Sequence, residues 1–562
     1  MKRFLWLGFV LFFYLICTGC GDTFRPIIIP NPPIFPNPQA AHTVLSINDN
    51  GIFVAGSAMV IDVSGDTDVS VANNGIAPVH AVQQTASQVL VVNQAVTGMP
   101  PPLDGGCLIT QTNPSQVFNV CPSITKLTFN STVISSTATI TLPPSSAANF
   151  VATTESGQAY VSLPNYIPDP TKPTIVVPSI EVVNTTSNNL VTTIPVGNNP
   201  IAMAETPDGK KLYVANEGDS TISGFNTLGF SQRVGSPTAT SSAPIWLLAR
   251  SDSQMVYVLE KDGTLASLST VSTAGPDTFT EYPGLAVPDA ATMTYDPNLN
   301  RLYIAGGQEM EMIDVSQSPP ALITTIAIPP FPLLNLPSVA ATATSAAALP
   351  DGSRVYVASY ATLPSELTIS SISGDGTNAT YAYTLTAGHD LNPGATVTVS
   401  NLPADTEFEG QFIVGAIVSG TAACPGTCFQ IPNTTVLAST SVSASGTGSN
   451  IFPQVTVVNE TSNTTKTTAA VPGFPDATIV GSPYYVPACA NPANARFRMM
   501  MAAGGNSTRV YLSSCDGGMV NIIDTSSDTY GLNLPAPVSS RTVVGNNGQN
   551  PPQNPVFLLA GP

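Results

Sequence analysis

The 562-residue sequence predicts an all-β fold, and three observations support this prediction. Short alternating apolar runs are separated by stretches rich in Ser, Thr, Asn, Pro and Gly, a pattern typical of strands and turns rather than helices. A strand-like core related to LYVA recurs seven times along the chain. Each copy stands among further strand-like runs, which together make a unit of four antiparallel strands. A repeated four-strand unit of this kind predicts a β-propeller with one blade per unit.

The seven copies of the core mark the second strand of each unit. They lie at residues 89–92, 159–162, 212–215, 256–259, 302–305, 355–358 and 510–513. An apolar run and a tight turn precede most copies, as in TPDGKK at 206–211. Proline fixes φ at one turn position and glycine takes the left-handed one, so these turns join the first strand to the second. An alternating third strand follows, as in TISGFNT at 221–227.

The two ends of the chain supply the strands of one more blade. Residues 43–48, 59–64 and 68–73 fit a second, third and fourth strand, whereas NPVFLLAG at 554–561 fits a first strand. Combining them closes the ring and removes its open edges. The sequence therefore predicts seven complete four-stranded repeats plus a blade split between the termini. The strand count favours eight blades, and seven blades is the alternative.

The plainest copies resemble the YVTN family of bacterial and archaeal β-propellers, which is named for a strand like LYVAN at 212–216. The resemblance covers most of residues 75–540, is close around 195–227 and is recognisable elsewhere by register. It implies a surface β-propeller. Some propellers that resemble this one are lactonases or quinone-cofactor dehydrogenases, so the resemblance alone leaves the activity open.

The sixth repeat is interrupted by residues 364–450, which we expect to form a small inserted all-β module. Within it, HDLNPGATVTVSNLP at 389–403 followed by FEGQFIVGAI at 408–417 resembles small β-modules found in bacterial surface proteins. The insert divides the propeller into a first part, 43–363, and a second part, 451–562.

The N-terminus predicts export. Lys2 and Arg3 precede an apolar stretch at 4–16, and CTGC at 17–20 follows it, which fits a signal peptide over 1–19 rather than a membrane span. CTGC resembles a bacterial lipobox, so we expect Cys20 to carry lipid; a plain signal peptide is the alternative. Residues 20–42 would then form the lipidated N-terminus and a proline-rich tether. Proline-rich segments extend by about 3.1 Å per residue.

The remaining cysteines predict three disulfides. They lie in neighbouring pairs, as expected in an oxidising compartment. The predicted bonds are Cys107–Cys121, Cys424–Cys428 and Cys489–Cys515. Zinc binding is disfavoured because the cysteine spacing is wrong and the chain has only 3 histidines. We expect neither a metal ion nor a cofactor.

The charge of the chain excludes nucleic-acid binding. Its 17 basic and 35 acidic residues give a formal net charge of −18, and no Lys/Arg cluster occurs. A protein that binds a phosphate backbone needs a basic face.

One face of the predicted propeller carries all the long connections. In an antiparallel blade, the second-to-third and fourth-to-first connections emerge on the same side, which we call the loop face. The long ones are 93–123, 163–178, 328–343, 471–494 and the insert. Loops on a rigid scaffold commonly form binding surfaces. The candidate binding residues are Phe331, Leu333, Leu334, Phe474, Tyr484 and Tyr485. Alternatively, these residues pack the loops and the insert onto the ring.

Catalytic signals are sparse. A metal-dependent lactonase needs converging carboxylates or histidines in the central channel. His80 and Glu205 stand isolated in first strands that are otherwise mostly apolar, which favours structural roles for both. The acidic turns at 217–219 and 260–262 are favoured as solvated turns over weak calcium sites. No Ser/His/Asp set, P-loop or dinucleotide fingerprint is present, so we predict no catalytic residue.

Together these features predict an exported, lipid-anchored β-propeller that acts as a non-enzymatic binding or scaffold protein of the bacterial cell envelope. Its expected partners are the membrane, through the lipid, and an envelope protein or glycan. Gly21 rather than Asp after Cys20 favours the outer membrane or cell surface. The alternative is a propeller hydrolase of lactonase type. A purely structural surface-layer role is a third interpretation that the sequence does not separate from the first.

Overall fold

The computed structural model of the chain describes residues 42–539 and 550–561, except 52–53, 96–105, 113–114, 145–146, 154–156, 170, 173, 332, 334, 392–394, 403–406, 422–423, 471–498 and 551. Regular structure within these residues is β-strand apart from two short 3₁₀ turns, Glu217–Asp219 and Cys515–Gly517. No helix in this part of the chain is long and apolar enough to cross a membrane. The all-β prediction is confirmed.

Seven sheets have four antiparallel strands each. In order from the first strand to the fourth, they are β39–β1–β2–β3 (Asn554–Ala560, Thr43–Asp49, Ala55–Asp62, Thr67–Ile76), β4–β5–β8–β9 (Pro78–Thr85, Gln88–Asn93, Ser123–Asn130, Val133–Thr141), β10–β11–β12–β13 (Val151–Thr153, Gln158–Leu163, Ser179–Asn184, Asn189–Pro195), β14–β15–β16–β17 (Pro200–Glu205, Lys211–Asn216, Thr221–Asn226, Thr238–Ala239), β18–β19–β20–β21 (Pro244–Ala249, Met255–Glu260, Thr264–Ser269, Thr278–Ala286), β22–β23–β24–β25 (Ala290–Asp296, Arg301–Gly306, Glu309–Asp314, Ala321–Ala327) and β35–β36–β37–β38 (Met499–Ala503, Arg509–Ser514, Met519–Asp524, Thr529–Pro535).

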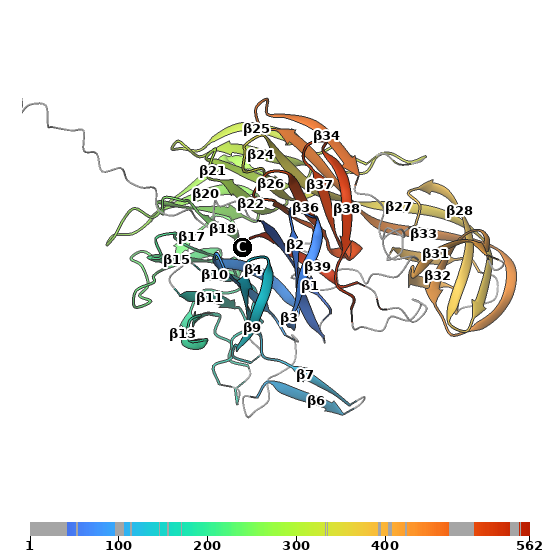
Figure 1. The fold of residues 1–562 in the computed structure, drawn as a ribbon, viewed down its shortest axis with the longest axis horizontal. Coiled ribbons are helices and arrows are strands. Elements are labelled where there is room, and N and C mark those ends of the chain that lie inside the picture. Colours follow the sequence, from blue (N-terminus) through green and yellow to red (C-terminus); the bar gives the residue numbers. More distant parts are fainter. Residues whose placement is uncertain are drawn as a thin grey trace, which may run out of the picture.

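A further set of four strands belongs to a nine-stranded sheet. These strands are β26 (Thr342–Ala348), β27 (Arg354–Asp375), β33 (Val436–Asn459) and β34 (Thr464–Ala470), paired in that order. The innermost strands contact one another in the order β39, β4, β10, β14, β18, β22, β26, β35 and back to β39. The ring therefore consists of the seven four-stranded sheets plus this set, which makes eight blades (Figure 1).

The split blade is confirmed by the pairing of the two ends of the chain. Strand β39 runs antiparallel to β1, with Leu559 opposite Leu45. Strands β2 and β3 complete the sheet. Ring closure is thus achieved by backbone hydrogen bonds between segments about as far apart in sequence as the chain allows, which leaves no open inner edge.

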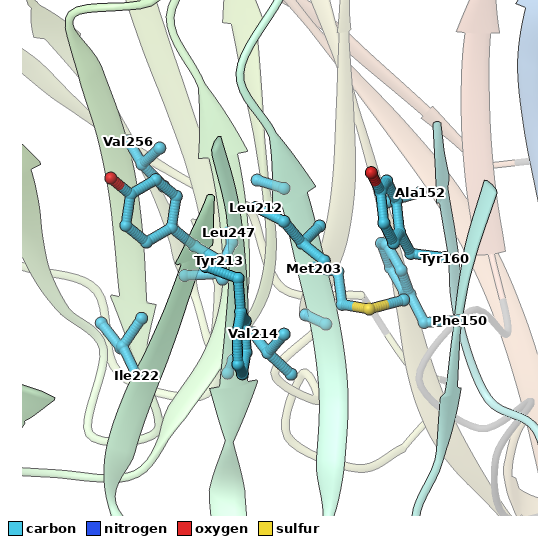
Figure 2. Packing of buried hydrophobic residues seen from close by; sticks show 14 of the residues in the cluster. Phe150, Ala152, Tyr160, Met203, Leu212, Tyr213, Val214, Ile222, Leu247 and Val256 are labelled. Carbon is cyan, nitrogen blue, oxygen red and sulfur yellow. The ribbon is translucent and has the colours of Figure 1, made fainter. Parts of the chain in front are cut away.

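The apolar core lies between neighbouring blades. The second strand of each blade is flanked by strands of its own blade and covered on both faces by the adjacent blades. Its sequence is therefore a continuous apolar run. Its tyrosine is among the largest fully buried side chains in six blades, at Tyr160, Tyr213, Tyr257, Tyr303, Tyr356 and Tyr511. Figure 2 shows Tyr160 and Tyr213 on successive blades with Met203 between them.

The predicted insert is an all-β module that shares two strands with its blade. Strands β27 and β33 are 22 and 24 residues long and remain paired as far as Asp375 and Val436. The other strands of the module are β28 (Asn378–Gly388), β29 (Thr396–Ser400), β30 (Gly410–Ile413), β31 (Ala416–Thr421) and β32 (Cys424–Pro432). Because β27 and β33 continue unbroken from the blade, no flexible linker separates the module from the ring.

The module closes on itself and has its own core. The chain from β30 to β31 pairs with β29 at its start and with β32 at its end, so it joins both edges of the sheet. At the junction, the Val414 N–H donates to the Ala395 carbonyl and the Gly415 N–H donates to the Gln430 carbonyl. Tyr381 and Phe429 stack in the interior with ring centroids 4.7 Å apart.

Two of the predicted disulfides are confirmed. Cys107–Cys121 closes the excursion that carries the hairpin β6–β7 (Leu108–Thr112, Ser115–Asn119), and Cys424–Cys428 lies within the module. Cys515 is also disulfide-bonded. Its predicted partner, Cys489, lies outside the described residues, as does the predicted lipid site Cys20.

Candidate functional site

The centre of the ring is filled by an aromatic cluster. The His80 ring on β4 stacks on Phe150, with centroids 3.8 Å apart, and lies 4.8 Å from the Phe557 ring on β39. Trp246 on β18 meets Phe150 edge-on at 5.6 Å. Strands β18 and β39 lie on opposite sides of the ring, yet Trp246 and Phe557 pack in the same apolar cluster. The aromatic side chains therefore span the central channel.

His80 and Glu205 both have structural partners. The His80 side chain is 5% exposed, and its Nδ1 atom accepts a hydrogen bond from the Val151 N–H at 3.5 Å. Glu205, at the end of β14, is paired with Tyr160 on the preceding blade. Burial and then the charge and hydrogen bonding of Glu205 raise the pKa of the Tyr160 hydroxyl. These contacts agree with the structural roles that the sequence favoured for both residues.

The described residues contain no group of three or more His, Cys, Asp or Glu side chains that could hold a metal ion. The acidic turns are engaged in local bonds instead. Asp219 accepts hydrogen bonds from the backbone and side chain of Asn198, both at 2.6 Å. Glu217 forms an ion pair with Lys261 of the next blade at 2.9 Å.

In five of the six blades that carry it, the recurring tyrosine binds an acid of the following blade, whereas Tyr257 bonds to Arg250 of its own blade. In four repeats a cation stands two residues before it, giving the pattern Lys/Arg-x-Tyr. Side chains two apart in a strand point to the same face, so cation and hydroxyl reach the same residue; Arg301 differs in donating to the backbone carbonyl of that residue rather than to its carboxylate. The resulting sets are Lys211 and Tyr213 with Asp277, Arg301 and Tyr303 with Glu460, Arg354 and Tyr356 with Asp528, and Arg509 and Tyr511 with Asp66.

Asp277 makes the most complete of these ties. Its Oδ2 atom accepts from the Tyr213 hydroxyl at 2.8 Å, and its Oδ1 atom accepts from Arg233 Nη2 at 2.7 Å. Lys211 Nζ lies 3.8 Å away. The Asp277 and Arg233 side chains are 6% and 3% exposed. The LYVA core thus provides both the apolar packing and the polar connection between blades.

Sequence reasoning did not identify these ties. The cation two residues before the tyrosine was a usable signal, because i and i+2 share a strand face. The acceptor carried a weaker signal. All four acids lie in the connection between a third and a fourth strand, but Asp277, Asp528 and Asp66 directly precede the fourth strand whereas Glu460 directly follows the third.

The loop face does not present Phe331 to solvent, as a binding anchor would require. The Phe331 side chain is 6% exposed and meets Phe452 edge-on, with ring centroids 5.4 Å apart. Leu333 is half-buried against the same cluster. The expectation of an exposed anchor at Phe331 is therefore wrong, because Phe452 in β33 covers it. Leu334, Phe474, Tyr484 and Tyr485 lie outside the described residues.

The loop that carries Phe331 braces the base of the inserted module. Gln454 on β33 donates to the Pro329 carbonyl at 2.8 Å, and Asn335 donates to the Thr386 carbonyl of β28 at 3.5 Å. The His389 ring lies 4.7 Å from that of Phe452. These contacts agree with the alternative interpretation, in which Phe331 and Leu333 pack the loop and the insert onto the ring.

Phe331→Ala should therefore reduce stability rather than ligand binding. We expect a loss of about 2–3 kcal/mol, less than in the rigid channel because a loop can relax into the vacated space. Chemical denaturation measures the loss, and limited proteolysis should cut the 328–341 loop earlier in the variant. Unchanged stability would contradict the packing role.

The comparisons with known proteins give no family. No protein-family model matches the chain, and no curated protein matches it. The YVTN resemblance therefore rests on the repeat sequences alone.

Three solved structures that resemble the chain share little sequence with it. Apo AztD from Citrobacter koseri has a TM-score of 0.46 at 8% identity, covering 92% of this chain and 98% of that chain. A functionally unknown protein from Desulfotomaculum acetoxidans has a TM-score of 0.41 at 9% identity, covering 61% and 92%. Kuenenia stuttgartiensis hydrazine synthase has a TM-score of 0.33 at 11% identity, covering 67% and 83%. Similarity at this level transfers no function.

Proposed function

We propose that this protein is an exported, lipid-anchored β-propeller of the YVTN type that serves as a non-enzymatic binding or scaffold protein of the bacterial cell envelope. The observation that carries this proposal is that the chain enters the propeller on the face opposite the loop face. An anchor at the N-terminus would then leave the long loops and the inserted module pointing away from the membrane.

The entry point follows from the position of β1 in its blade. Strand β1 is a second strand, so it starts on the side of the short first-to-second and third-to-fourth connections, which we call the turn face. The His42 carbonyl accepts from the Val63 N–H at 2.9 Å, in the turn between β2 and β3. The Gly561 N–H donates to the Thr43 carbonyl at 3.1 Å. A proline-rich tether of about 13 residues would add a spacer of roughly 40 Å below this face.

The channel supports a binding role over a hydrolase. Aromatic side chains occupy the position where a propeller hydrolase would need converging ligands for a metal ion. The two titratable candidates, His80 and Glu205, are engaged in packing and in a bond between blades. The partner we propose is an envelope protein or glycan that contacts the loop face.

The remaining candidate anchors are aromatic residues of the 471–494 loop. Buried aromatic side chains dominate most binding energies at protein interfaces. We expect the double variant Tyr484→Ala/Tyr485→Ala to weaken capture of a partner from the organism's own envelope extract by about tenfold or more, with the melting temperature unchanged. Leu228→Ala is the matched control, because Leu228 is 92% exposed but lies on a connection of the turn face.

Equal capture by both variants would contradict a binding role for this loop. The hydrolase alternative predicts instead that the purified protein opens lactones and that a chelator stops the reaction. Such activity at ordinary enzymatic rates would replace the scaffold proposal.

The anchor is tested separately. Cys20→Ser should move the protein from the membrane fraction to the soluble fraction, because the thiol is the proposed lipid attachment point. A variant that remains membrane-bound to the same extent would contradict lipidation at Cys20.

A further inference from the structure

Two carboxylates meet at a pair of consecutive serines on the loop face. Ser241 and Ser242 lie in the connection between β17 and β18. The Ser242 N–H donates to Glu260 Oε2 at 2.8 Å. The Ser241 N–H and hydroxyl donate to Glu281 Oε1 and Oε2 at 2.9 and 2.7 Å. Glu260 ends β19 and Glu281 lies in β21, so both strands hold the connection through these bonds.

Glu260 is fully buried, with 0% of its surface exposed. Its Oε1 atom has no hydrogen-bond donor among the residues that the structure describes. A buried carboxylate oxygen without a donor is costly, and a second carboxylate beside it adds repulsion. The arrangement therefore requires a species that neutralises one of the two charges.

The groups around Glu260 favour a proton rather than a bound cation as the species that neutralises one carboxylate. The charged groups near Glu260 are Glu281 from β21, Asp262 from the β19–β20 turn, and Lys261, whose ammonium is paired with Glu217 of the neighbouring blade at 2.9 Å. No third acidic or histidine ligand joins the pair in the described part of the chain. Divalent metal binding normally needs more oxygen ligands than two carboxylates supply.

We propose that Glu260 and Glu281 share one proton and form a pH-dependent latch that holds the 240–243 connection against the β18–β21 blade. With the proton on Glu260, its hydroxyl donates to the Glu281 carboxylate, and Glu281 keeps its bonds to Ser241. Loss of that proton leaves two negative charges in contact and releases the connection.

The pKa of Glu260 agrees with this arrangement. Burial is the main cause of the raised pKa, which is about 7; the Ser242 hydrogen bond lowers it, and Glu281 and Asp262 raise it further. Because this value lies above the ordinary one, the closed state binds the proton more tightly than the open state does. The latch is fully effective below about pH 4.5, weakens as the pH rises towards 7, and changes little above that.

Opening of the latch would affect only the part of the loop face around the 240–243 connection. Strand β17, which precedes the connection, has only 2 residues, Thr238–Ala239. Backbone bonds hold the two ends of the connection, from the Thr240 N–H to the Ser220 carbonyl and from the Lys261 N–H to the Ala243 carbonyl, and the two glutamates hold the serines between them. Release of the connection would change the loop face between two neighbouring blades while the ring, closed elsewhere by full sheets, remains intact.

Hydrogen exchange of the full-length protein between pH 5 and 8 tests the latch. After correction for the intrinsic rate, we expect protection of the peptide spanning 238–246 to fall roughly 40-fold from pH 5 to 7 and by no more than about twofold above pH 7. In Glu281→Gln the new amide donates to Glu260 at every pH, so protection should stay constant within about threefold. Asp262→Asn is the matched control and should retain a pH dependence, shifted slightly to lower pH, because Asp262 raises the pKa of Glu260 less than burial and Glu281 do.

Three results would overturn the latch. The first is the same pH dependence in Glu281→Gln as in the unaltered protein. The second is a pH-independent protection of 238–246 in the unaltered protein. The third is a parallel loss of protection in peptides from distant blades, such as 509–524, because it would indicate global unfolding.

Discussion

Asp277→Asn should lower the free energy of unfolding by about 3–5 kcal/mol, one of the two largest losses we expect from a single substitution. The Asp277 carboxylate neutralises Arg233 and Lys211 and accepts the Tyr213 hydroxyl at the junction between two blades. Arg233 is 3% exposed, so its charge has no access to water when the carboxylate is removed. An unpaired buried charge costs several kcal/mol, far more than the attraction lost in a solvated pair.

A surface pair supplies the control for this prediction. Asp252 also pairs with an arginine, Arg250, but the Asp252 side chain is 42% exposed. Asp252→Asn should therefore cost less than about 1 kcal/mol. Denaturant unfolding monitored by Trp fluorescence compares the two variants. Similar losses at Asp277 and Asp252 would show that the tie between blades does not depend on its buried charge.

Phe150→Ala should destabilise the protein by a comparable amount, about 3–5 kcal/mol. The Phe150 ring stacks on His80 and contacts the edge of Trp246, and it is 6% exposed. Truncation removes these contacts and opens a cavity at the centre of the ring. Strands from several blades converge there, so the surrounding structure cannot relax far into the space.

Thermal melting measures this loss against Leu228→Ala, which should leave stability within about 0.5 kcal/mol because the side chain is exposed. A further variant, His80→Phe, distinguishes the packing of the ring from the role of its nitrogen atoms, since a phenyl ring can replace imidazole between Phe150 and Phe557. We expect it to fold with a loss of about 1–3 kcal/mol, smaller than that of Phe150→Ala, because the phenyl ring keeps the packing while the Val151 N–H loses its acceptor. Full stability of Phe150→Ala would contradict the closed channel.

The sequence by itself determined the features that depend on neighbours along the chain. Turn residues and alternating apolar runs located the hairpins, and counting strands gave eight blades including the one split between the ends. The disulfides Cys107–Cys121 and Cys424–Cys428 span only 14 and 4 residues, so proximity in sequence was a sound guide. Such features are encoded locally, through φ restrictions and side-chain alternation.

Only the tertiary structure decided which side chains meet across blades. Tyr213 reaches an acid 64 residues away, whereas Tyr511 reaches one 445 residues away, because ring closure brings the first and last blades together. Phe331 is covered by a ring far along the chain, and Glu260 meets Glu281 through the packing of one blade. Burial and charge at a position depend on all its spatial neighbours, and a single sequence specifies those only through the completed fold.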